Sequence, residues 1–182
     1  MNNFICHSGG APGADTIFET CCEEFGIKVI AYSFKNHDTK SKNGLELSIK
    51  ELNEGFEHVM IAERTLNRRL DKLPVYVKNL LARNWYQVKN SDAVFAVSTF
   101  QNNIVSGGTG WACQMAIDNK KPIYLFDQSK NGWFKFDYDE LVFMFIDYIP
   151  TLTKNFAGIG TREINEHGID AILQLIKENV ER

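Results

Sequence analysis

The chain has 182 residues, of which 44% are hydrophobic and 24% are charged, and its formal net charge is −3. These values are typical of a single globular domain, residues 1–182, that is large enough to bury its own core. The acidic balance disfavours a general nucleic-acid partner, which would need a basic surface. No apolar run approaches the roughly twenty residues that span a bilayer, so we expect no membrane partner either.

The predicted elements alternate between strands and helices. Strands are predicted at 4–6, 28–32, 93–97 and 122–126, with a further strand that begins at 156 and enters a glycine turn. Helices are predicted at 14–25, 45–56, 59–66, 74–87 and 111–119, and a final one follows Asn165, its expected N-cap, to 180. Continuous apolar strands between helices predict a Rossmann-like α/β fold, in which helices cover both faces of a parallel sheet.

Three further segments and features bear on this fold. Residues 36–43 are polar and are predicted to form a loop, and Pro12 suits a first helical turn. The aromatic stretches 133–136 and 143–146 predict either an edge hairpin or an irregular segment.

The first residues, Met1 to Phe4, do not have the pattern of a secretory signal. The four cysteines show no C-x-x-C spacing, and the four histidines form no pair at helical spacing. We therefore expect free thiols, a cytoplasmic location, and neither a metal site nor a cofactor.

Two glycine-rich turns carry the main functional signal. The sequences SGGAPGAD at 8–15 and SGGTGW at 106–111 each follow an apolar run and precede a helical stretch. Glycines in this context let backbone N–H groups approach a phosphate, and the helix N-terminus favours negative charge. Neither turn has the spacing of a dinucleotide fingerprint or a P-loop, and each could be only a tight turn that needs positive φ. Together they predict a ligand with phosphate or ribose groups between them.

A third turn, GIGTRE at 158–163, and the helical motif RNxxQV at 83–88 complete a pattern. The combination resembles the SLOG superfamily of Rossmann-like domains, which bind nucleotides and nucleotide-derived signals and include the LOG-type phosphoribohydrolases and the DprA proteins. It is similar in particular to uncharacterised SLOG-like proteins of bacteriophages. The resemblance covers nearly the whole chain, apart from 36–75 and 131–150.

In many members of that superfamily, the strand that ends in Gly-Ser-Arg comes first. Here the similar sequence Gly160-Thr161-Arg162 lies near the end of the chain. The resemblance therefore implies a permuted arrangement in which the last strand pairs beside the first. All three turns would then meet at the carboxyl ends of neighbouring strands, where open α/β sheets bind ligands.

LOG-type enzymes carry the sequence Pro-Gly-Gly-x-Gly-Thr-x-x-Glu. In this chain Ser106 stands at the proline, Trp111 replaces the threonine and Gln114 replaces the glutamate, while Arg83 falls where that family has a helix arginine. Hydrolysis of an N-glycosidic bond is suited to a carboxylate, whereas a glutamine cannot ionise. The departure favours binding without turnover, unless Asp15, Asp92 or Glu163 supplies a carboxylate.

The predicted ligand-binding residues belong to the three turns and to the helix of Arg83. They are Ser8, Gly9, Gly10, Gly13, Asp15, Arg83, Asn84, Gly107, Gly108, Thr109, Gly110, Trp111, Gln114, Thr161 and Arg162.

Several of these residues have a plainer alternative role. Asp15 would suit the dipole of a first helical turn as well as a ribose, and Arg83 could pair with a surface acid. Trp111 could lie in the core or stack on a purine. Arg162 is suited to a phosphate clamp. Residues 64–69 are predicted to form a solvated helix face.

We expect a non-catalytic protein that binds a nucleotide- or NAD-derived small molecule. The phage resemblance sharpens this to a sponge for an ADP-ribose-type or cyclic-nucleotide immune signal. The alternatives are a LOG-like nucleoside 5′-monophosphate phosphoribohydrolase and, less favoured by the acidic charge, a DNA-processing accessory. The resemblance also implies a homo-oligomer, and the aromatic segment 133–148 would either form that interface or pack onto its own sheet.

Overall fold

The computed structural model describes residues 3–42 and 44–181. The strands of the main sheet are β1 (Ile5–Ser8), β2 (Lys28–Phe34), β3 (Gly44–Leu47), β4 (Ala93–Ser98), β7 (Ile123–Asp127), β8 (Gly132–Asp137), β9 (Val142–Ile146) and β10 (Asn155–Gly160). The helices are α1 (Ala14–Glu24), α2 (Ile49–Leu66), α3 (Val75–Lys89), α4 (Gly107–Asp118) and α5 (Glu166–Glu181). A small separate hairpin consists of β5 (Phe100–Gln101) and β6 (Ile104–Val105).

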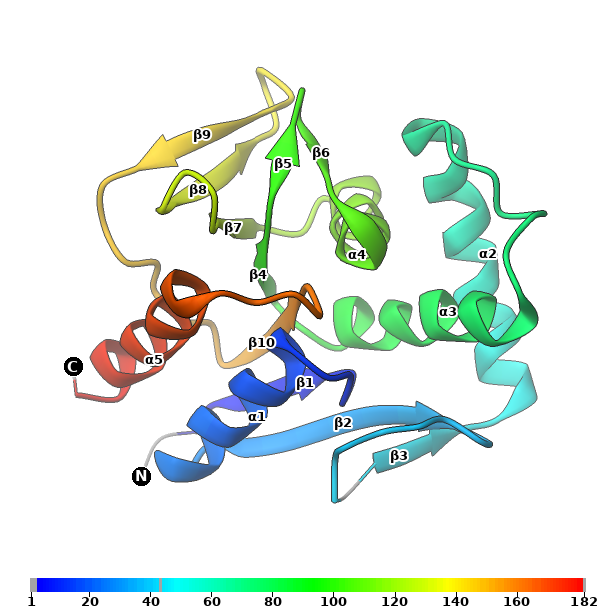
Figure 1. Ribbon diagram of the computed structural model, residues 1–182, viewed down its shortest axis with the longest axis horizontal. Helices are drawn as coiled ribbons and strands as arrows, with labels where there is room; N and C mark the ends of the chain where they lie inside the picture. Colours follow the sequence, from blue (N-terminus) through cyan, green and yellow to red (C-terminus); the bar gives the residue numbers. More distant parts are fainter. Residues whose placement is uncertain (1–2, 43, 182) are drawn as a thin grey trace.

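The main sheet has the strand order β3-β2-β1-β10-β4-β7-β8-β9 (Figure 1). Its first six strands are parallel, and β8 and β9 add an antiparallel end. The C-terminal strand β10 lies between β1 and β4, with Ile5 opposite Asn155. The structure thus confirms that the last strand of the chain pairs beside the first.

Helices cover both faces of the sheet, as the continuous apolar strands predict. One layer contains α1 and α5, and the other contains α2, α3 and α4 (Figure 1). Every residue of β4 is buried, because this strand lies under both layers. The architecture is therefore Rossmann-like α/β.

The structure corrects the predicted boundaries between residues 44 and 66. Residues 44–47 form β3, which pairs with β2, whereas a helix was predicted from residue 45. The predicted helices at 45–56 and 59–66 are one helix, α2, which begins after Ser48. Ser48 and Glu51 form a capping box, and this local signal fixes the start of the helix better than the spacing of leucines does.

Three further corrections concern the glycine turns and the segment before α4. Helix α4 begins at Gly107 and not at residue 111, so the second glycine sequence forms its first turn. The β5–β6 hairpin that precedes α4 was not predicted. Pro12 lies in a turn before Gly13, the N-cap of α1, and so falls outside the helix.

The expectations for the aromatic stretches, for Asn165 and for the cysteines hold. Residues 132–146 form the edge hairpin β8–β9, one of the two predicted possibilities. Asn165 caps α5, since its Oδ1 accepts a hydrogen bond from the Gly168 amide at 3.0 Å. All four cysteines are free and buried. Across the described residues, none of the helices combines the length and the apolar character that crossing a membrane would require.

Candidate functional site: a cleft at the carboxyl ends of β1, β10 and β4

The first and third glycine turns are joined directly by hydrogen bonds. The Ala14 amide donates to the Thr161 carbonyl oxygen at 3.0 Å, and the Gly160 amide donates to Asp15 Oδ1 at 3.0 Å. The Thr161 amide in turn donates to the Val97 carbonyl oxygen of β4 at 2.9 Å. These bonds hold the ends of three neighbouring strands together at the edge of the sheet where open α/β folds bind ligands.

Two glycines of the first turn make this close approach possible. Gly13 has φ 100°, and a Cβ atom there would lie 2.4 Å from the Thr161 carbonyl oxygen. A Cβ atom at Gly9 would lie 1.3 Å from Nη1 of Arg83. Gly13 therefore requires glycine, whereas a larger residue at position 9 would displace the buried guanidinium of Arg83.

A cleft of about 650 Å³ opens at this edge, between α3, the N-terminus of α4 and the third glycine turn. Eight of the predicted ligand-binding residues line it: Asp15, Arg83, Asn84, Gly107, Gly108, Thr109, Thr161 and Arg162. The volume lies within the range of roughly 300–1,000 Å³ typical of small-molecule sites.

Arg83 is the most unusual side chain of the cleft. It is buried, its Nη1 lies 3.6 Å from Asp15 Oδ2, and Nη1 donates to Gln87 Oε1 at 2.9 Å. Its Nε is buried and has no hydrogen-bond partner among the described residues. A buried donor without an acceptor is costly, so this guanidinium has capacity for a further anionic or polar partner.

Asp15 is the carboxyl group beside Arg83. Burial raises the pKa of Asp15 to about 6, although the charge of Arg83 and the hydrogen bond from Gly160 oppose that shift. Asp15 is therefore mostly ionised at neutral pH and takes up a proton as the pH falls through about 6.

Two arginines, Arg83 and Arg162, lie close to the first and third turns, together with the carboxyl groups of Asp15 and Glu163. Arg162 is exposed at the cleft and forms no ion pair within residues 3–42 and 44–181. Burial, with the charges of Arg83 and Arg162, lowers the pKa of His37 to about 4. Two arginines thus act on one small region, which favours an anionic ligand.

The N-terminus of α4 forms the opposite side of the cleft. Gly107, Gly108 and Thr109 line it, and the first amides of a helix have no intrahelical acceptor. Arg68 holds this turn in place, since it donates to the carbonyl oxygens of Gly107 at 2.8 Å and Val105 at 2.9 Å. The prediction that 64–69 is merely a solvated face is wrong for Arg68.

Three predicted side chains lie away from the cleft. Trp111 is buried in the core layer of α2–α4, which corresponds to the plainer of its two predicted roles. Gln114 donates to Asp118 at 2.8 Å on its own helix. The Ser8 hydroxyl donates to Glu19 at 2.5 Å and accepts from the Gly10 amide.

The remaining predicted positions are backbone supports. Gly9, Gly10, Gly13 and Gly110 do not line the cleft. Gly110 packs against β6, where a Cβ atom would meet the Val105 carbonyl oxygen at 2.1 Å. Asp92, a possible source of a carboxylate, precedes β4 and so lies at the other end of that strand from the cleft, where it binds Asn155.

The cleft also contains residues that sequence reasoning did not select. Ser98 is the last residue of β4 and Thr99 comes directly after it, while Gln128 comes directly after β7. Val77 and Leu80 form an apolar side of the cleft on α3. The positions of Ser98 and Gln128 at strand ends were a usable signal. Glu163, considered only as a source of a carboxylate, lines the cleft beside Arg162.

No group of three or more potential metal-ligating side chains occurs in the part of the chain that the structure describes. The cleft is lined by two arginines, two carboxyl groups, side-chain amides, hydroxyl groups, the first residues of α4 and an apolar wall. This lining is suited to a ligand that carries anionic groups and a ring system.

No protein-family model matches the chain, and no curated protein matches it in sequence. Among solved structures, it is similar to the crystal structure of a candidate molybdenum carrier protein from Syntrophus aciditrophicus. The two chains are 14% identical and superpose with a TM-score of 0.54, over 96% of this chain and 93% of the other. At this identity the similarity supports the shared fold, a Rossmann-like α/β sheet covered by helices.

Proposed function

We propose that the cleft binds a nucleotide- or NAD-derived small molecule through its phosphate groups and holds it without cleaving it. The observation that carries this proposal is the buried Arg83, whose Nε lacks a partner among the described residues while the side chain borders the cleft. The proximity of Arg162 and of the α4 N-terminus supports the same conclusion.

Each side of the cleft would recognise a different part of such a molecule. Arg162 and the amides of Gly107 and Gly108 are suited to phosphate oxygens. Asp15 and Thr161 offer polar atoms to ribose hydroxyl groups, and Leu80 belongs to an apolar side that suits a base.

Retention without cleavage rests on the resemblance to LOG-type enzymes, since Gln114 replaces their glutamate. One observation favours the alternative, a phosphoribohydrolase. Asp15 and Glu163 both line the cleft, and a carboxyl group whose pKa is raised to about 6 is suited to general acid catalysis. Product analysis distinguishes the two functions.

The biological form of the proposal is a sponge that sequesters an ADP-ribose-type or cyclic-nucleotide immune signal. It rests on the resemblance to SLOG-like phage proteins. The similarity to a candidate molybdenum carrier offers another small-molecule cargo, so molybdate belongs in the same test.

The test is titration calorimetry with ADP-ribose, a cyclic dinucleotide, AMP and molybdate, followed by chromatography of each mixture. We expect one nucleotide to bind at one molecule per chain with no release of free base. Arg162→Ala should weaken that binding about 10- to 100-fold, because charge-assisted hydrogen bonds are lost. Arg64→Ala, an exposed arginine of α2, is the matched control and should bind normally.

A second variant, Gly108→Ala, tests the other side of the cleft. Nothing lies within 4 Å of a Cβ atom at this position, so the fold accepts alanine and the methyl group occupies ligand space. Unchanged affinity in both Arg162→Ala and Gly108→Ala would contradict the proposed site. If free base accumulates from AMP, the protein is a hydrolase and not a binding protein. If only molybdate binds, the ligand is molybdate and not a nucleotide.

A further inference from the structure

Strand β9 forms one end of the main sheet, and its outer edge pairs with no strand among residues 3–42 and 44–181 (Figure 1). Natural edge strands are usually protected by lysine, proline or a bulge. The sequence of β9, VFMFI, contains neither a charge nor a proline. Met144 is 50% exposed and Phe145 is 63% exposed. The Phe143 amide donates to Asn103 Oδ1 at 3.1 Å, and the edge beyond it, from Met144 to Ile146, is open to an added strand.

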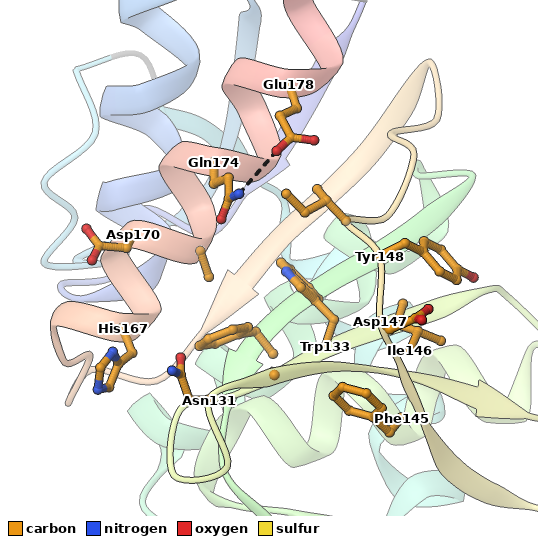
Figure 2. Close-up of a pocket in the computed structure, with 14 residues that line it drawn as sticks. Asn131, Trp133, Phe145, Ile146, Asp147, Tyr148, His167, Asp170, Gln174 and Glu178 are labelled. Carbon is orange, nitrogen blue, oxygen red and sulfur yellow. Dashed lines mark hydrogen bonds between the residues drawn. The ribbon is translucent and has the colours of Figure 1, made fainter.

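A second cleft, of about 730 Å³, lies beside this edge and is separate from the ligand cleft. Figure 2 shows α5 along one side, with His167, Asp170 and Gln174 on it, and shows Trp133 and Phe145 of the β8–β9 hairpin opposite. Aromatic faces and helix side chains thus flank the same space.

The charges of this second cleft have one sign. Among the residues that the structure describes, its charged lining side chains are Asp147, Asp170 and Glu178, and none is a lysine or an arginine. Asp139 and Glu140 precede β9 in the connection from β8. A cleft whose lining includes both carboxylates and aromatic side chains favours a Lys or Arg side chain, through ion pairing and cation–π attraction.

A second copy of the chain is a poor match for this edge. In an antiparallel pair of two β9 strands, the start of one strand faces the end of the other. Glu140 of one chain would then come close to Asp147 of its neighbour, and like charges across a strand pair are unfavourable. The open edge and the charge pattern together call for a basic partner.

We propose that β9 accepts an extended basic segment of a partner polypeptide as an added strand, with a Lys or Arg side chain of that segment in the second cleft. Backbone hydrogen bonds along β9 would supply affinity, and the cleft would supply selectivity for positive charge. This interaction is independent of the proposed small-molecule function.

The test uses two capped synthetic peptides with alternating valine and charged residues around a central phenylalanine, one with lysine and one with glutamate. Binding is measured by fluorescence anisotropy with the complete chain. We expect the lysine peptide to bind at least about tenfold more tightly than the glutamate peptide, and added salt to weaken it. Binding of the lysine peptide should also slow hydrogen exchange in β9 and leave exchange in β3, the other edge of the sheet, unchanged.

Two charge-changing variants and one control localise the site. Met144→Lys and Asp170→Lys should each weaken binding of the lysine peptide. Leu45→Lys on β3, where Leu45 is 54% exposed, should leave that binding unchanged. Three results would overturn the proposal: equal binding of both peptides, equal losses in all three variants, or a dimer in sedimentation that Met144→Lys dissociates. The last of these would identify a second copy as the occupant.

Discussion

Asp15 and Arg83 form a buried pair at the cleft, in which Nη1 of Arg83 lies 3.6 Å from Asp15 Oδ2. The glycine context and the SLOG resemblance selected both as ligand-binding residues, a role that stays a prediction. Their pairing, and the burial that governs Asp15, depend on β10 lying between β1 and β4. Trp111 and Gln114 were selected by the same motif, but their side chains point elsewhere, because a motif fixes spacing and not side-chain direction.

Asp15 also makes the stability of the folded protein depend on pH. Its pKa in the folded protein, about 6, lies above its ordinary value of 3.8. The folded state therefore binds a proton more tightly than the unfolded state does, and this contribution to stability is full below about pH 4 and is lost as the pH rises through 6.

We predict that Asp15→Asn removes this dependence. Between pH 4 and pH 7 the stability of the natural protein should fall relative to that of the variant by about 3 kcal/mol at most. Urea unfolding at each pH measures the difference. Because Arg83 loses its partner, the variant is less stable at every pH, so the test compares how the free energy of unfolding changes with pH and not its absolute value. If the two proteins change in parallel with pH, the pKa of Asp15 is not shifted.

At the scale of elements, the type of most strands and helices was predictable, whereas some boundaries were not. Buried β4 and amphipathic α5 have strong patterns. Residues 44–47 form a short edge strand only because β2 is available to pair with them. The two-residue strands β5 and β6 are too short to show any periodicity.

The packing of α2 on α3 depends on Gly55. A Cβ atom there would lie 2.2 Å from the Ala82 carbonyl oxygen, which belongs to helix backbone and cannot move away freely. We predict that Gly55→Ala destabilises the protein by about 1–3 kcal/mol, even though alanine favours a helix. Thermal unfolding checks this.

Gly108→Ala is the matched control for that measurement, because it also replaces a helical glycine but meets open space. It should leave the melting temperature unchanged or raise it. Equal effects in the two variants would show that close packing at Gly55 is not the cause.

At the scale of the whole molecule, the two clefts lie in different parts of the sheet. The ligand cleft is at the carboxyl ends of its central strands, and the second cleft is beside β9 at one end. The homo-oligomer implied by the SLOG resemblance stays a prediction. The acidic flanks of β9 indicate that such an assembly would use another surface.

Native mass spectrometry of the purified chain mixed with ADP-ribose, a cyclic dinucleotide or AMP tests the central claim most directly. The account predicts that the chain gains the mass of one intact nucleotide-derived molecule, that this molecule is released unchanged on heating, and that Arg162→Ala does not retain it. A chain that gains no nucleotide mass, or that releases free base and ribose phosphate, would contradict the account.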